Sequence, residues 1–164
     1  MLNKNANNAR KTLALGLIAT GVVLTLTGCG ATGVESPTRN MRQVTDGVEG
    51  QTGDIKARNV LLVAQPDGSA VLIGTLINSG NNADSLTGIS VNGINAKIDP
   101  ATNNLILNKP VIFSGDSANA KAVFAGLKAT PSSRVDMTFT FANSASLKLN
   151  VLVREKSDIY ANVG

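Results

Sequence analysis

Few residues in this sequence of 164 could carry chemistry, and the one that stands apart is Cys29. It is the only cysteine, and Leu26, Thr27 and Gly28 directly precede it. A thiolate is a strong nucleophile, so Cys29 is a natural place for covalent modification. A single cysteine cannot form a disulfide within the chain, and the complete lack of histidine excludes Ser-His-Asp and Cys-His catalytic sets.

Carboxylates are the other groups that could take part in catalysis or bind a metal ion. Paired carboxylates could serve as the catalytic acids of a glycosidase. Most Asp residues of the predicted domain, however, lie at expected turns, where Asp is common because its side chain forms hydrogen bonds with nearby backbone groups. These residues are Asp67, Asp84, Asp99, Asp116 and Asp136. Asn81, Asn82 and Asp84 could offer oxygen ligands to Ca²⁺, although a role in a turn explains them by itself. The glycines form no dinucleotide-binding or phosphate-binding motif. We therefore expect no enzyme, no cofactor and no metal site.

The residues before Cys29 have the pattern of a secretory signal peptide. Lys4, Arg10 and Lys11 supply a positive start without any acid, and an apolar run of 15 residues follows from Thr12 to Leu26. A permanent membrane span is the alternative, but spans need about 20 apolar residues, and threonine and glycine interrupt this run. We predict a signal peptide over residues 1–28.

The stretch Leu26-Thr27-Gly28-Cys29 resembles the bacterial lipobox, which is a Leu, two small residues and a Cys. The resemblance implies that a diacylglyceryl group is attached to the Cys29 thiol and that cleavage between Gly28 and Cys29 makes the cysteine the new N-terminus. Two acyl chains hold a protein to a membrane far better than one. The expected location is the outer leaflet of the cell membrane, with the chain facing the extracytoplasmic space and membrane lipid as a partner through Cys29.

Residues 29–53 are predicted to be the lipidated cysteine and a flexible linker. They are rich in Gly, Ser, Thr and Pro and show no sustained period of a helix or strand.

The balance of basic and acidic residues also changes at Cys29. Three of the 15 basic residues and none of the 11 acids precede it, which leaves 12 against 11. Because the remaining basic residues are scattered and aromatic residues are few, we expect no nucleic-acid partner.

Residues 54–155 are predicted to be one all-β domain. Short apolar runs separated by turn residues indicate strands over 55–64, 69–78, 85–91, 94–98, 104–107 and 110–113, with Asn92-Gly93 as a tight turn. Strict alternation indicates two more strands over 134–141 and 147–153, joined as a hairpin. About seven to nine short strands favour an antiparallel immunoglobulin-like or cupredoxin-like sandwich, with a barrel as the alternative. Residues 156–164 read as a loose tail.

The stretch from Gly74 to Gly88, with its Asn78-Ser79-Gly80 loop and Asp84-Ser85-Leu86, resembles an element of the periplasmic copper chaperones called PCu(A)C. Ser114-Gly115, residues 125–128 and the last two strands are similar to that family's later segments. With the lipobox, the chain resembles the LpqE-like lipoproteins of actinobacteria. The resemblance implies the sandwich fold over roughly residues 55 to 154.

The resemblance does not extend to copper ligands. The chaperones bind Cu(I) through two His and two Met, which are suited to that ion. In this chain the corresponding positions fall at Lys121, at Val123 and near Ala96 or Lys97, and residues 104–113 contain no Met. Met41 lies in the predicted linker, and Met137 stands on the apolar side of a strand, which favours core packing.

Three functions remain open at this stage. The first is a non-enzymatic binding or positioning module with an envelope protein or glycan as partner. The second is a carrier of a metal or small ligand that uses other side chains than the chaperones, and the third is an enzyme with an unfamiliar site. A hydrophobic groove would favour the first, clustered carboxylates the second, and a deep pocket with perturbed acids the third.

Overall fold

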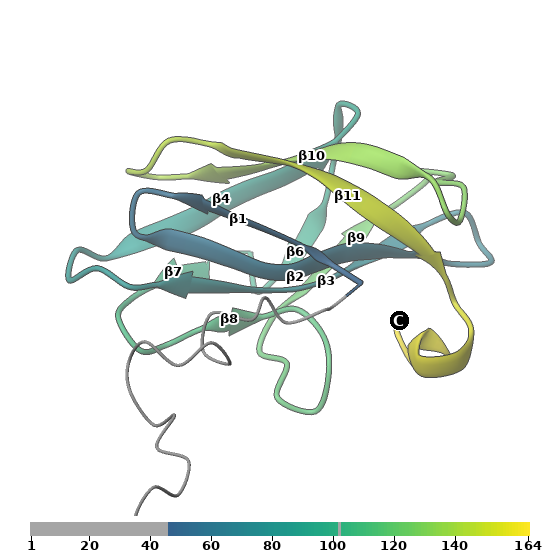
Figure 1. Ribbon diagram of the computed structural model, residues 1–164, viewed down its shortest axis with the longest axis horizontal. Helices are drawn as coiled ribbons and strands as arrows, with labels where there is room; N and C mark the ends of the chain where they lie inside the picture. The colour runs from purple at the N-terminus through teal and green to yellow at the C-terminus, as the bar shows by residue number, and fades with distance from the viewer. Residues whose placement is uncertain (1–45, 102) are drawn as a thin grey trace, which may run out of the picture. The chain divides into compact units, whose positions relative to one another are not determined.

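The computed structural model describes residues 46–101 and 103–164, and these residues form a β-structure with one short 3₁₀ helix (Figure 1). The strands are β1 (Val48–Thr52), β2 (Ile55–Ala64), β3 (Ala70–Asn78), β4 (Asp84–Val91), β5 (Ile94–Asn95), β6 (Lys97–Asp99), β7 (Asn103–Leu105), β8 (Val111–Ile112), β9 (Lys121–Phe124), β10 (Arg134–Phe141) and β11 (Leu147–Glu155). The 3₁₀ helix η1 covers Asp158–Tyr160.

The strands follow the order β5-β4-β10-β11-β2-β3-β9-β6, while β1, β7 and β8 pair with β2, β4 and β3. Ala96 alone separates the two ends of this path in the sequence, so the sheet nearly closes on itself. In Figure 1, β4, β10 and β11 form one layer and β2 and β3 lie in the other. The all-β sandwich prediction is confirmed, with a barrel-like closure and one parallel pair, β2 with β11, among antiparallel neighbours.

The core forms because alternate side chains of each strand point inward. In β10, Met137, Phe139 and Phe141 are buried, whereas Asp136 before them and Thr140 between the two Phe residues are exposed. The buried residues belong to one hydrophobic cluster to which all five long strands, β2, β3, β4, β10 and β11, contribute side chains. The burial of Met137, which is 0% exposed, confirms the prediction that it packs in the core.

The turns form where the sequence places residues that favour them. Asn92 and Gly93 have φ of +49° and +81° and join β4 to β5, the positive values that a two-residue hairpin turn needs. The hairpin of β2 with β3 and that of β10 with β11 both form as expected. The predicted strand over 94–98 is divided at Ala96, because its first part pairs with β4 and its second with β9.

The sheet begins earlier than the sequence predicts. β1 lies inside the stretch assigned to the linker and pairs with β2, so the linker prediction is wrong for residues 48–52. Arg58 and Glu49 form an ion pair between the two strands. A bulge in β2 places Asn59 at φ +50°, and its side-chain oxygen accepts a hydrogen bond of 3.1 Å from the Gly47 N–H.

Two further elements were absent from the expectation. β9 pairs with both β3 and β6, and it extends the sheet at the end of the path. The predicted loose tail instead contains η1, whose Tyr160 hydroxyl donates a 2.8 Å hydrogen bond to Asp46. The C-terminal segment, defined here as residues 157–164, is therefore fastened to the residue that precedes β1 by two positions.

Candidate functional site

The predicted cleavage and lipidation residues, Gly28 and Cys29, lie outside the described residues. The signal peptide, the cleavage and the acyl anchor therefore stay predictions. Within residues 46–101 and 103–164, none of the helical structure has the length and apolar character of a membrane span.

A buried polar cluster fixes the loop between β3 and β4. Asn78 is 1% exposed, and its amide donates to the carbonyl oxygens of Asn82 at 2.7 Å and Leu105 at 2.9 Å. Its side-chain oxygen accepts a 2.9 Å hydrogen bond from the Gly80 N–H. The side chain thus satisfies backbone groups of a loop that would otherwise be left unpaired at the edge of the core.

Asp84, the first residue of β4, connects the same loop to the turn between two neighbouring strands of its own layer, β10 and β11. Its Oδ1 accepts hydrogen bonds from the N–H groups of Ser85 at 2.7 Å and Asn143 at 2.9 Å, and its Oδ2 accepts one from Ser144 at 2.9 Å. Burial raises the pKa of Asp84, but the hydrogen bonds from Ser144, Ser85 and Asn143 outweigh it and hold the pKa below its ordinary value. Asp84 therefore ties the β3–β4 loop to the turn between β10 and β11.

These contacts bear on the calcium alternative. Asn81 and Asn82 are exposed, and both oxygens of Asp84 face backbone N–H groups of the β10–β11 turn or of its own strand. The described residues contain no group of three or more His, Cys, Asp or Glu side chains that could hold a metal ion. Local hydrogen bonding accounts for Asp84 without a cation.

The positions at which the resemblance places metal ligands come together on β6 and β9. Lys97 is the register partner of Val123, and Asp99 is that of Lys121. Ala96 joins this edge to β4 through a 2.8 Å hydrogen bond from its N–H to the Ile89 oxygen. Val has no donor atom and Lys carries neither an imidazole nor a thioether, so these positions lack the side chains that suit Cu(I).

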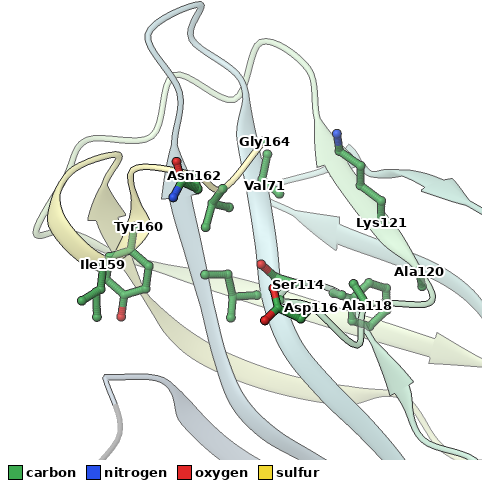
Figure 2. Close-up of a pocket in the computed structure, with 14 residues that line it drawn as sticks. Val71, Ser114, Asp116, Ala118, Ala120, Lys121, Ile159, Tyr160, Asn162 and Gly164 are labelled. Carbon is green, nitrogen blue, oxygen red and sulfur yellow. The ribbon is translucent and has the colours of Figure 1, made fainter.

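Beside this edge runs a groove of about 540 Å³ between β3 and the C-terminal segment (Figure 2). Its apolar walls include Val71, Ile73, Phe113 and Val163, and polar groups stand among them: Ser114, Asp116, Lys121, Tyr160 and Asn162. In Figure 2 the ring of Tyr160 and the side chain of Ile159 lie on one side of the groove, and Ala118, Ala120 and Lys121 lie on the other. A volume of this size suits a small ligand or a short segment of a partner.

The C-terminal wall of the groove is held by Asp46. Its Oδ2 accepts hydrogen bonds from the Tyr160 hydroxyl at 2.8 Å and from Arg154 Nε at 3.1 Å, and it lies 2.6 Å from Arg154 Nη2. The bonds from Tyr160 and Arg154 hold the pKa of Asp46 below its usual value. Burial and the carboxylate of Asp46 raise the pKa of Tyr160. Sequence reasoning missed this cluster because Asp46 is more than 100 residues from Arg154 and Tyr160 along the chain.

No protein-family model matches the chain, and a sequence search of curated proteins finds no match. Among solved structures, the copper-bound PCuAC domain from PmoF2 is similar with a TM-score of 0.57 and 19% identity, over 66% of this chain and 98% of that chain. The apo PCuAC domain from PmoF1 gives 0.56 and 18%, over 66% of this chain and 99% of that one. At these identities the likeness concerns the fold, which confirms the expected PCu(A)C-like sandwich.

Proposed function

We propose that the chain is a lipoprotein held by acyl chains on Cys29 in the outer leaflet of the cell membrane, with an LpqE-like sandwich that acts as a non-enzymatic binding module in the envelope. The basic start, the apolar run and the lipobox-like Leu26 to Cys29 support the anchor. The fold supports the second half of the proposal, because it provides a rigid core with a groove on its outer side.

One observation carries the choice of a binding module over a copper carrier. The β6–β9 pairing sets Lys97 beside Val123 at the edge where the resemblance places His and Met ligands. The scaffold is therefore present with side chains that lack the donors for a soft cation. The groove next to this edge is the surface that supports recognition of an envelope protein or glycan.

The acids also favour a non-enzymatic module. Hydrogen bonds from Tyr160 and Arg154 lower the pKa of Asp46, and those from Ser69 lower that of Asp67. A general acid at neutral pH needs a raised pKa instead. The carboxyl groups with lowered pKa values therefore do not suit the role of a general acid.

A small-ligand carrier is the second candidate, and the groove favours it. Its volume of about 540 Å³ falls in the range of ligand pockets, and apolar walls alternate with a few polar groups. Crosslinking in intact cells followed by mass spectrometry separates the candidates. Recovery of a protein or glycan bonded near Lys121 supports the binding module, whereas recovery of the chain alone favours the carrier.

The anchor is tested by changing Cys29 to Ala. We expect the variant to accumulate as unlipidated precursor and to leave the detergent phase, because the thiol that carries the acyl chains is gone. Partition of the variant with detergent, as for the original chain, would contradict the anchor.

The exclusion of copper is tested by Cu(I) titration against a competing chelator. We expect no site tighter than that of free thioether peptides. A matched triple variant, Lys97→His with Lys121→His and Val123→Met, places soft and borderline donors on the paired strands and should gain affinity. A nanomolar site in the original chain would overturn the exclusion.

A further inference from the structure

We propose that the turn formed by Ile159 and Tyr160 in η1 is a membrane-contacting surface that rests on the lipid bilayer to which the chain is anchored. The inference depends on the proposed anchor at Cys29 and adds an orientation to it. It assigns the end of the sandwich that carries η1, and with it the C-terminal wall of the groove, to the membrane side. A partner in the groove would then bind next to the bilayer.

Ile159 is the most exposed large hydrophobic residue of the described chain. Its exposed fraction is 82%, and Leu107, at 43%, is the other one in this class within residues 46–101 and 103–164. Single exposed apolar residues are common on soluble domains. The position of Ile159 is therefore what distinguishes it.

That position is the point at which the N-terminal part of the chain enters the domain. Tyr160, the next residue, donates its 2.8 Å hydrogen bond to Asp46, and Arg154 pairs with the same carboxylate. The sequence separates Cys29 from Asp46 by 16 residues that are predicted to be flexible linker. A flexible chain of that length spans roughly 20 to 25 Å, so the anchor keeps Asp46 and the adjoining turn near the bilayer.

The chemistry of the turn suits the interface between lipid and water. Ile159 offers an apolar side chain, and Tyr160 combines a ring with a hydroxyl, which is the kind of side chain enriched at membrane interfaces. The neighbouring charges have both signs: Arg154, Glu155, Lys156 and Asp158. Contact should therefore depend on apolar burial and little on anionic lipid.

The strength of this contact explains why it needs the anchor. Full burial of one Ile favours the bound state by roughly tenfold to a hundredfold, which is too little to recruit a free domain from solution. The tether makes the contact intramolecular and raises its effective concentration. A weak apolar contact can then set the orientation of an anchored domain.

The experiment uses the absence of Trp from the whole sequence. Ile159→Trp and, as matched control, Leu107→Trp are prepared in the full lipidated chain and reconstituted into phosphatidylcholine vesicles with brominated or unbrominated acyl chains. We expect Trp emission from Ile159→Trp to be shifted to the blue and quenched at least twofold by brominated lipid, and emission from Leu107→Trp to be unchanged. The quenching should persist at high salt.

Flotation of the same vesicles separates the two proposals. If the protein floats with the vesicles but Ile159→Trp is not quenched, or both variants are quenched equally, the orientation is overturned while the anchor stands. If the protein does not float, the anchor fails and the orientation fails with it. Loss of quenching at high salt would show that charges hold the turn to the bilayer, which would overturn the apolar contact.

Discussion

Replacement of Asp84 by Asn should weaken the connection between the start of β4 and the turn between β10 and β11. The variant keeps an oxygen in the place of Oδ1, which can still accept from Ser85 and Asn143. In the place of Oδ2, however, an NH₂ group would face the N–H of Ser144, donor against donor. Loss of the charge weakens the two remaining bonds as well.

The magnitude follows from the number and exposure of these bonds. Hydrogen bonds to a charged group contribute about 1.5–3 kcal/mol each, and an unpaired buried donor costs a similar amount. Asn143 is exposed and Ser144 half-buried, so water can partly replace the lost partner. We expect the free energy of unfolding of Asp84→Asn to fall by about 2 kcal/mol at neutral pH, between these limits.

The loss of unfolding free energy in Asp84→Asn should depend on pH. The pKa of Asp84 in the folded chain is lowered from 3.8, so the carboxylate stabilises the fold fully above pH 3.8. This contribution is lost as pH falls from 3.8 through the lower folded value. Because the Asn variant cannot titrate, the difference between the two proteins should shrink below pH 3.8.

Urea denaturation followed by circular dichroism, at pH 7 and at pH 3, measures both effects. Hydrogen exchange of the Asn143 and Ser144 amides gives a local readout, and both should exchange faster in the variant. Asp116→Asn is the control, because it removes an exposed carboxylate and should change stability by less than about 0.5 kcal/mol. Two results would refute the reasoning. The first is that Asp84→Asn is as stable as the original chain at pH 7, and the second is that its loss of unfolding free energy is as large at pH 3 as at pH 7.

Two further predictions concern the core and the C-terminal segment. Met137→Ala should destabilise the fold by about 2–5 kcal/mol in urea denaturation, because the side chain is fully buried, whereas Met137→Leu should cost less than about 1.5 kcal/mol; equal losses would contradict the packing. Tyr160→Phe removes the hydrogen bond that most lowers the pKa of Asp46, so the pKa of Asp46 should rise toward 3.8 in a carboxyl NMR titration. Amides of residues 157–164 should then exchange faster, and an unchanged Asp46 titration would contradict the bond.

Most of the sheet could be predicted from the sequence because its strands carry their own signal. The alternation in β10 and β11 gives the buried side directly, and Asn92-Gly93 specifies a turn through its positive φ values. Such features depend on neighbours within a few residues, so reasoning from local pattern reaches them.

The elements that were missed depend on distant contacts. β1 reads Val48-Glu49-Gly50-Gln51-Thr52, which has no apolar alternation. Gly50 fits there because a Cβ would lie 2.4 Å from Leu149 Cδ2, a constraint that only the folded chain reveals. The bond of Tyr160 to Asp46 spans 114 positions, and neither residue carries a local signal for it.

The edge formed by β6 and β9 shows why a likeness in fold leaves the function of this chain open. The pairing of Lys97 with Val123 is made by backbone groups of β6 and β9, so it needs no donor atoms in the side chains at those positions. Copper binding depends on the donor atoms alone. A shared fold therefore does not by itself carry a metal site, and the function of this chain has to be argued from its own side chains rather than from the fold.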